Sequence, residues 1–334
     1  MKFLSFPTMI GWSITSKCNL RCIFCSQNAG QPTSDELTTN QCYSILDQVA
    51  RYNASIIGFT GGEPFLRRDI DSIVTYAIRR GLRCVITTNG TLLQKIPVSC
   101  LVKFIKIRMS LDAPDASLHE KLRGVNNIFS TIIDNIKFVK TLGIKREIVT
   151  TIGRYNLQIL DEMFSFLTTL KIEEWSLSIL TPTGRGSNLQ DHCLNPEEYY
   201  AIIEKLISFK KSAPFHIKVD IPQFAAIYSQ PLKNKGEHYC SAATDLMVIF
   251  PDGQVGPCFT LPLTDGNAKY NDLYHIWNTS NLFKLFRDKS LLKSNCCGCE
   301  LVKQCGGCRA YAYAVTGDLL SGDPLCWHRR AVQF

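Results

Sequence analysis

Three cysteines near the N-terminus are the residues of this sequence best suited to redox chemistry. Cys18, Cys22 and Cys25 lie in the stretch TSKCNLRCIFC, with the spacing C-x3-C-x2-C. Three thiolates this close together can wrap one face of a four-iron cubane cluster and leave its fourth iron open to a chelating ligand. The alternatives are cysteines without a shared role, or a zinc site with a distant fourth ligand. Their position in a loop directly after a predicted strand favours the iron–sulfur site.

A second group of cysteines lies near the C-terminus. The spacing C-x2-C-x5-C-x2-C over residues 296–308 is followed by Cys326 and preceded by Cys240 and Cys258. Fifteen cysteines in 334 residues, without an export signal, are typical of metal ligands rather than of disulfides. A zinc knuckle would use the four closely spaced cysteines and leave the other three unexplained, so iron–sulfur clusters are the better prediction.

Composition is that of an ordinary globular protein, with 45% hydrophobic and 20% charged residues. No apolar run reaches the roughly 18 residues of a membrane span, and the first residues lack the apolar core of a signal peptide. We therefore expect a cytoplasmic protein without a membrane partner. The formal charge of +8 is scattered in short basic pairs, so solvated surface charge explains it better than nucleic-acid binding.

The first half of the sequence alternates short apolar segments with longer amphipathic ones. Strands are predicted at residues 10–15, 55–60, 83–87, 104–111, 145–152 and 175–180. Helices are predicted between them, at residues 39–52, 70–80, 126–142 and 156–170. Six repeats of this kind predict an α/β fold with parallel strands, built as a partial (β/α)6 barrel, with an open sheet as the alternative.

The sequence divides into three expected parts. Residues 1–190 form the barrel, which the turn-rich segment TPTGRGSN closes. Residues 191–235 connect the barrel to the rest and contain a helix near residues 196–211. Residues 236–334 form a small cysteine-rich domain that depends on metal for its order.

The cysteine triad, followed by GGEP at residues 61–64, resembles the radical S-adenosylmethionine (SAM) superfamily over about the first 180 residues. The resemblance implies that a reduced [4Fe–4S] cluster cleaves SAM to a 5′-deoxyadenosyl radical, which abstracts hydrogen from a substrate. It also implies a set of SAM contacts. Phe24 would lie against the adenine, and Gly61, Gly62, Glu63 and Pro64 would meet the amino group. The ribose and carboxylate would be lined by Thr88, Asn89, Ser110 and Asp112.

The positions of these residues agree with such a role, because each follows a predicted parallel strand, where barrel enzymes place their chemistry. Glycines allow a backbone to approach a ligand, and Glu63 can accept a hydrogen bond from an ammonium group. Taken alone, GGEP could equally be an ordinary tight turn.

The C-terminal cysteines resemble the SPASM domain, the auxiliary-cluster extension of radical SAM enzymes. The stretch CGGCRAYAYAVTGDLLSGDPLC and a predicted helix at residues 272–287 support the resemblance. It implies two auxiliary clusters of the [4Fe–4S] type, which would be held by Cys296, Cys299, Cys305 and Cys326 and by Cys240, Cys258 and Cys308. Cys297 could replace Cys296. No cysteine lies a few residues before Cys240, so the second cluster has either an open iron or a ligand such as His238 or Asp245.

The remaining cysteines and histidines have no pattern that indicates a site. Small buried side chains are the expected role of Cys42, Cys84, Cys100 and Cys193. Structural roles are expected for His119, His192 and His216. If a side chain quenches a substrate radical, the candidates are Cys193 and Tyr311.

For the reaction, the sequence leaves three hypotheses. The preferred one is a peptide maturase that cross-links, oxidises or epimerises a peptide, which either comes with a separate carrier protein or binds directly. The second is an enzyme acting on a small molecule such as a tetrapyrrole, a sugar or an antibiotic precursor. The third is a non-enzymatic zinc module. Either enzyme needs an electron donor such as flavodoxin or ferredoxin.

Overall fold

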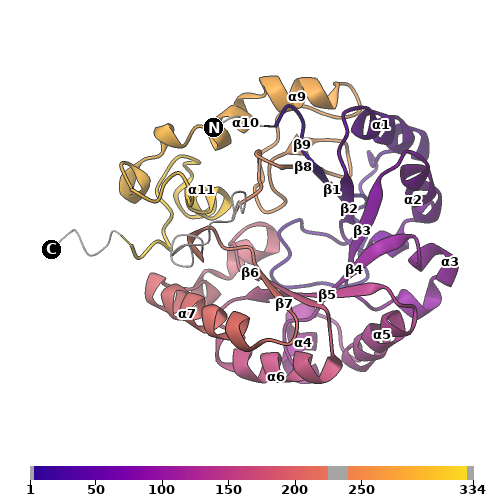
Figure 1. The fold of residues 1–334 in the computed structure, drawn as a ribbon, viewed down its shortest axis with the longest axis horizontal. Coiled ribbons are helices and arrows are strands. Elements are labelled where there is room, and N and C mark those ends of the chain that lie inside the picture. Colours follow the sequence, from indigo (N-terminus) through magenta and orange to yellow (C-terminus); the bar gives the residue numbers. More distant parts are fainter. Residues whose placement is uncertain (1–3, 225–239, 329–334) are drawn as a thin grey trace.

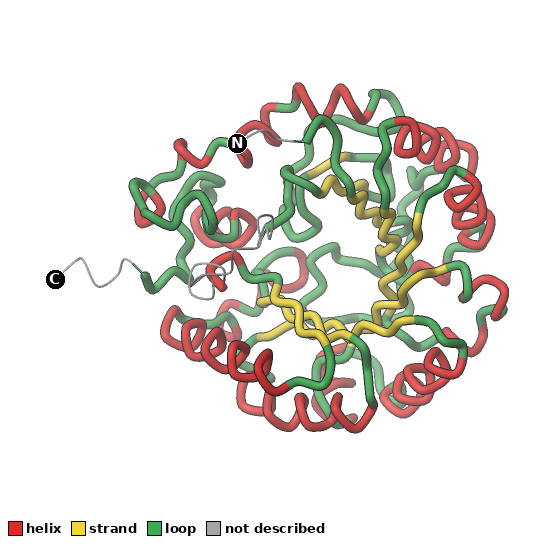
Figure 2. Tube along the Cα trace, viewed as in Figure 1, coloured by secondary structure: helices red, strands yellow, loops and turns green. Residues whose placement is uncertain are grey.

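The computed structural model describes residues 4–224 and 240–328, which form a curved parallel sheet with helices on its outer side (Figures 1 and 2). The strand order is β7-β6-β5-β4-β3-β2-β1-β8-β9, and every neighbouring pair is parallel except β8 and β9. The strands are β1 (Met9–Ser13), β2 (Ile56–Thr60), β3 (Arg83–Thr88), β4 (Phe104–Ser110), β5 (Lys145–Ile152), β6 (Glu174–Ile179), β7 (His216–Val219), β8 (Leu246–Ile249) and β9 (Val255–Gly256).

Helices connect the strands and cover the convex side of the sheet, as Figure 1 shows. Those of the barrel are α1 (Thr39–Arg51), α2 (Ile70–Arg79), α3 (Val98–Leu101), α4 (Ala116–Arg123), α5 (Phe129–Thr141), α6 (Leu160–Leu170) and α7 (Pro196–Ser212). The C-terminal segment adds α9 (Leu273–Thr279), α10 (Asn281–Arg287) and α11 (Arg309–Thr316). None of the described helices is long and apolar enough to cross a membrane.

The two faces of the sheet differ in burial. On β2, β3 and β4 the side chains alternate between buried and half-exposed. The buried set, such as Phe59, Ile86 and Ile107, joins the core beneath the helices. Because side chains of a strand alternate between faces, the half-exposed set points to the concave side. The inner face is therefore open to solvent, unlike the packed interior of a closed eight-stranded barrel.

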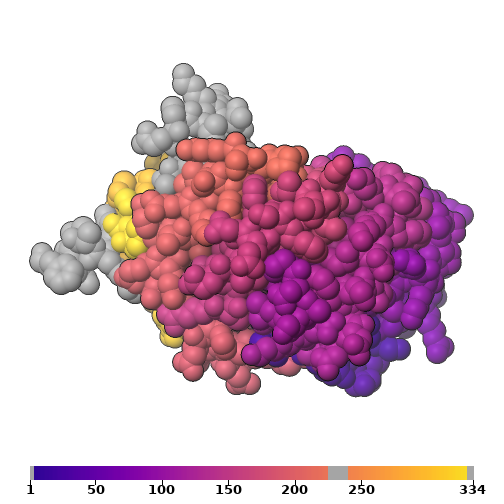
Figure 3. Space-filling view, turned by 90° about the horizontal axis from the view of Figure 1, so that it is seen from below, coloured from indigo at the N-terminus to yellow at the C-terminus, as the bar shows by residue number. Residues whose placement is uncertain are grey.

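The C-terminal segment is built onto the barrel rather than standing apart from it. Strand β8 pairs with β1, matching Gly11 to Val248, and Trp277 of α9 belongs to the same core as Trp12 of β1. In Figure 1 the yellow segment around α11 lies between the two ends of the sheet, and Figure 3 shows its residues against the orange residues that include α7. Tyr199 of α7 accordingly packs on Trp327, with ring centroids 5.7 Å apart.

The predicted partial barrel is confirmed, with all six expected strands within about two residues of their predicted ends. Two short parallel strands were not predicted, β7 and β8, and they extend the sheet at both sides. The predicted helix at residues 272–287 is wrong as a single element. Ser280 divides it, because its hydroxyl caps the second helix by accepting from the backbone N–H of Phe283 (3.2 Å).

Candidate active site and auxiliary cluster sites

The loop after β1 carries the three N-terminal cysteines and is held in place by backbone hydrogen bonds. The N–H of Cys18 donates to the carbonyl of Gly30 (2.8 Å), and the N–H of Arg21 donates to that of Arg123 at the end of α4 (3.1 Å). Each sulfur also accepts a hydrogen bond: Cys18 from the N–H of Leu20 (3.4 Å), Cys25 from the N–H of Ala29 (3.4 Å) and Cys22 from Nη1 of Arg123 (3.6 Å). Donors placed around sulfur stabilise thiolates, which are the form that binds metal.

Arg185 fastens the same loop from the far end of the barrel. Its Nε donates to the carbonyl of Cys22 (2.9 Å) and its Nη1 to that of Ala29 (2.8 Å), while its own N–H donates to the carbonyl of Cys25 (3.0 Å). The turn-rich segment after β6 thus closes over the cysteine loop as well as ending the barrel.

The GGEP segment packs directly on the cysteine loop. The N–H of Gly62 donates to the carbonyl of Thr15 (2.7 Å), and that of Glu63 to the carbonyl of Lys17 (2.8 Å). A Cβ on Gly62 would come within 2.2 Å of the Lys17 carbonyl oxygen, and one on Gly61 (φ +141°) within 2.3 Å of that of Thr15. Glycine is therefore required for two loops to touch. Pro64 begins the short helix that ends this contact.

Glu63 connects the end of β2 with the end of β3. Its fully buried carboxylate accepts from the Thr88 hydroxyl (2.8 and 2.9 Å), from the N–H of Asn89 (2.8 Å) and from the N–H of Phe65 (3.2 Å). Burial raises the pKa of Glu63 to about 7, against the lowering effect of these donors. The Asn89 amide donates to Asn19 (2.8 Å), which lies between the first two cysteines. Glu63, Thr88 and Asn89 thus form one group beside the loop.

Asp112 and Phe24 meet around Arg123, a residue that the sequence did not single out. Arg123 lies 2.5 Å from the Asp112 carboxylate and 5.2 Å above the Phe24 ring, and it also reaches Cys22. Asp112 is fully buried and accepts from the N–H of Thr151 (3.0 Å), while Phe24 stacks on Tyr155 at 5.8 Å. Ser110, at the end of β4, is half-exposed on the inner face. The sequence signal for Arg123 was Gly124, which ends α4 in a left-handed conformation.

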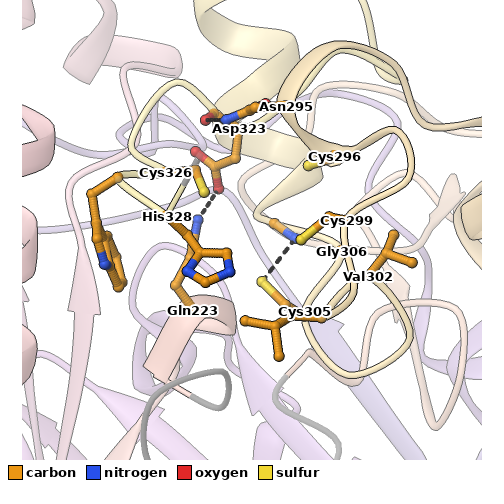
Figure 4. Close-up of a pocket in the computed structure, with 13 residues that line it drawn as sticks. Gln223, Asn295, Cys296, Cys299, Val302, Cys305, Gly306, Asp323, Cys326 and His328 are labelled. Carbon is orange, nitrogen blue, oxygen red and sulfur yellow. Dashed lines mark hydrogen bonds between the residues drawn. The ribbon is translucent and has the colours of Figure 1, made fainter. Parts of the chain in front are cut away.

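Four C-terminal cysteines line one cavity of about 200 Å³. They are Cys296, Cys299, Cys305 and Cys326, and Figure 4 shows their side chains around one space. The Cys305 sulfur accepts from the N–H of Gly307 (3.3 Å), and burial raises the pKa of Cys305 to about 12. Such a thiol keeps its proton at neutral pH until a metal displaces it. Neighbouring Cys297 is exposed, whereas Cys296 is buried at the cavity.

The structure also brings Cys308 close to Cys240 and Cys258. Burial raises the pKa of Cys308, and the charges of Asp323, Cys240 and Cys258 raise it further. Asp245, considered above as a further ligand, already accepts from the Thr8 hydroxyl (2.5 Å). His238 lies outside the described residues.

Asp323 joins the two auxiliary sites to the barrel. Its buried carboxylate accepts from the N–H of Cys308 (2.6 Å) and from the amide of Gln223 (2.5 Å), whose oxygen in turn accepts from the Tyr199 hydroxyl (2.6 Å). A continuous hydrogen-bonded chain therefore runs from α7 to the segment that carries both cysteine groups.

Comparison with known proteins decides the family. A model of the radical SAM superfamily matches residues 12–167, and a model of the iron–sulfur cluster-binding SPASM domain matches residues 240–309. The AdoMet-dependent heme synthase of Nitratidesulfovibrio vulgaris is 32% identical over 96% of this chain and 92% of its own. The chain belongs to the radical SAM superfamily. The AdoMet-dependent heme synthase of Methanosarcina barkeri is similarly close to this radical SAM enzyme, at 31% identity over 97% of both chains.

Solved structures show the same fold for this radical SAM enzyme. Streptococcus suis SuiB bound to precursor peptide SuiA has a TM-score of 0.79 and 23% identity, covering 96% of this chain and 76% of its own. SuiB bound to S-adenosylmethionine has a TM-score of 0.78 and 22% identity, covering 97% and 78%. At these identities the likeness concerns the fold.

Membership in this family means that the enzyme uses a [4Fe–4S] cluster with SAM and auxiliary clusters in its SPASM domain. The donors present fit such groups. Three half-buried sulfurs with hydrogen-bond donors suit a three-thiolate site, and the cavity lined by four cysteines suits a fully ligated one.

The structure gives different results for the remaining residues that the sequence singled out in this radical SAM enzyme. Cys193 and Tyr311, suggested for radical quenching, lie near one another at the junction of barrel and C-terminal segment, and the Cys193 thiol donates to the carbonyl of Leu189 (3.6 Å). Their role stays a prediction. The expected burial of Cys42, Cys84 and Cys100 is confirmed, whereas Cys193 is half-buried. His119 is buried, and its Nδ1 accepts from the N–H of Asp112 (3.2 Å), a structural contact.

Proposed function

We propose that this enzyme cleaves SAM reductively and removes hydrogen from a side chain of a tetrapyrrole. The observation that carries the proposal is the full-length similarity, above 30%, to two proteins named AdoMet-dependent heme synthases. The sequence alone favoured a peptide substrate and held a tetrapyrrole as an alternative. The relatives support that small-molecule alternative, and the peptide-bound SuiB structure concerns only the fold.

For the reacting site we propose that Cys18, Cys22 and Cys25 hold the cluster whose open iron chelates SAM. When bound, the cluster and SAM supply the 5′-deoxyadenosyl radical. The contacts of Arg185 and Glu63 support the assignment, because they fix the cysteine loop against the ends of β2, β3 and β6. The other SAM contacts that the resemblance implied remain part of this proposal.

For the auxiliary clusters we propose the two ligand sets that the resemblance implied. The cavity lined by Cys296, Cys299, Cys305 and Cys326 supports the first, and the mutual proximity of Cys240, Cys258 and Cys308 supports the second. The reductant is proposed to be a flavodoxin or ferredoxin. The division at residues 190 and 235 likewise stays a prediction.

The test is anaerobic reconstitution with iron and sulfide, followed by incubation with SAM, a reductant and iron coproporphyrin III. We expect 5′-deoxyadenosine, methionine and a porphyrin of altered mass. The C18A/C22A/C25A triple variant should form no 5′-deoxyadenosine while retaining about eight of about twelve irons.

Two results would argue against the proposal in different ways. If the triple variant still formed 5′-deoxyadenosine, the assignment of the reacting cluster would be wrong. If the wild-type enzyme cleaved SAM but never altered the porphyrin, with deuterium on the porphyrin side chains never reaching 5′-deoxyadenosine, the substrate class would be wrong.

A further inference from the structure

The inner face of the sheet is divided into two chemically different halves. On β2 and β3 the half-exposed inward residues Gly58 and Val85 are small or apolar, with the exposed Arg83 at the start of β3 as the exception. On the β4–β7 side many of the inward residues are charged: Lys106 and Arg108 on β4, Lys145 and Glu147 on β5, Glu174 on β6 and Lys218 on β7. The small apolar area at Gly58 and Val85 thus adjoins the charged side chains, because Val85 is in register with Lys106 on β4.

The charged half is a connected network. Glu147 accepts from Nζ of Lys106 (3.0 Å), from Nε of Arg108 (2.8 Å) and from the Ser176 hydroxyl (2.6 Å). Glu174 accepts from Lys218 (2.9 Å) and pairs with Lys106 and Lys145. Burial raises the pKa of Glu147, but the charges of Arg108 and Lys218 outweigh it and keep that pKa below its usual value. Both carboxylates therefore stay ionised.

The network contains more cations than carboxylates. Four cations, Lys106, Arg108, Lys145 and Lys218, face Glu147 and Glu174, and the charge of Asp220 also reaches this group, which leaves one cation in excess. Arg108 donates only through Nε, and neither Nη1 nor Nη2 has a hydrogen bond to any described residue. The side chains of Arg108 and Lys218 are 31% and 38% exposed, so both can still reach a ligand.

Arg108 lies close to the proposed SAM site, and Lys218 lies at the level of Ser110 on the edge strand β7, three strands away. Arg108 is in register with Thr87, the residue before Thr88, and is two residues before Ser110. Lys218 is in register with Ser176 on the neighbouring strand. A substrate seated on the inner face below the proposed SAM contacts would therefore meet both cations.

We propose that Arg108, with Lys218, binds a carboxylate of the substrate and so orients the substrate on the inner face. The inference rests on the proposed function, because tetrapyrroles of the haem type combine an apolar ring with carboxylate side chains. The area at Gly58 and Val85, where a Cβ on Gly58 would meet only the Ile10 carbonyl oxygen at 3.9 Å, accommodates part of the ring, and the cation excess on β4–β7 accepts the carboxylate. The free fork of an arginine matches a carboxylate in geometry as well as in charge.

The test compares the binding of iron coproporphyrin III with that of its tetramethyl ester in the same detergent. Binding to the reconstituted enzyme is measured as a change in Soret absorbance. Wild-type enzyme should bind the acid more tightly than the ester. R108Q should raise the Kd of the acid about tenfold to a hundredfold and leave that of the ester unchanged, because one charge-assisted contact is lost. The Kd of R108K for the acid should lie between those of wild type and R108Q, because lysine keeps the charge but lacks the two parallel N–H donors of a guanidinium group.

K205Q is the matched control, because Lys205 pairs with Asp161 at an exposed position on α7. It should bind both porphyrins as wild type does. The inference is overturned, with the proposed function intact, if R108Q binds the acid like wild type or weakens acid and ester equally. If wild type binds neither porphyrin, the proposed substrate class fails and the inference fails with it.

Discussion

The two cysteine-bearing regions of this enzyme are ordered in different ways. The N-terminal loop is held by contacts that contain no metal: backbone bonds to α4, glycines pressed against it from the end of β2, and the three hydrogen bonds of Arg185. The segment around residues 294–308 has only short helical turns, and three of its thiols surround a cavity together with that of Cys326. We therefore expect the first site to be preformed by the chain and the second to depend on the cluster proposed to fill it.

The contrast fits the roles proposed for the two regions. A site with an open iron cannot rely on a full set of ligands to fix its geometry, so the surrounding protein must do so. A fully ligated cluster can staple its own segment, much as structural zinc does in small domains.

Removal of the metal should produce the largest difference in order between the N-terminal loop and the C-terminal cysteine segment. In the apoprotein we expect limited proteolysis to cleave first within residues 293–308 and to leave residues 14–38 intact. Reconstitution should slow proteolytic cleavage of the C-terminal segment tenfold or more, because the cluster links the cysteines of this segment. Equal protection of both regions with and without metal, measured by mass spectrometry of the fragments, would remove the distinction.

Gly62→Ala should damage the N-terminal site without touching a cysteine. The new Cβ would come within 2.2 Å of the Lys17 carbonyl oxygen, so the loop must shift at a cost of about 1–3 kcal/mol. We expect the variant to retain the auxiliary iron, lose SAM cleavage and unfold at lower urea concentration.

Gly58→Ala is the matched control for stability, because its Cβ would meet only the Ile10 carbonyl oxygen, at 3.9 Å. A G62A enzyme as stable as G58A, with normal SAM cleavage, would show that the close contact between the two loops is unimportant.

The expected effect of Glu63 is on the pH dependence of the stability of the apoprotein. Burial raises its pKa to about 7, above the value of 4.5 for a free side chain, so the folded apoprotein holds this proton between those values while the unfolded chain releases it. Stability from this group is complete below about pH 4.5 and is lost as the pH rises through about 7, by up to about 3 kcal/mol.

Glu63→Gln removes that proton exchange and keeps an acceptor. Urea unfolding of both apoproteins at about pH 5 and about pH 8 should show a steeper loss of stability with pH for wild type than for E63Q. Parallel pH dependences would mean that Glu63 does not titrate in this range.

Much of the fold follows from local sequence signals, and the failures have physical causes. The strands of the first half were predictable because each is a compact apolar run followed by a turn. Strand β8 was not, because it has four residues and its partner β1 lies more than 230 positions away. Helix α4 was missed because its exposed face makes its sequence polar, and Arg123 was missed with it.

In the candidate site, too, some residues could be predicted from local sequence patterns and others could not. The cysteines and GGEP were visible as patterns, whereas their supports were not. Asn19, Arg123 and Arg185 act through contacts between segments far apart in the chain, and no spacing rule indicates such contacts. The pairing of Arg108 with Glu147 across two strands belongs to the same class.

Electron paramagnetic resonance of the reduced enzyme, with and without SAM, tests the central claim most directly. The spectrum of the C18A/C22A/C25A variant supplies the auxiliary clusters alone, and its subtraction from the wild-type spectrum isolates the N-terminal cluster. We predict that SAM changes this difference spectrum and leaves that of the variant unchanged, because only the N-terminal cluster would lie beside the residues proposed to contact SAM. A difference spectrum that SAM does not alter, or a variant spectrum that it does, would contradict the account.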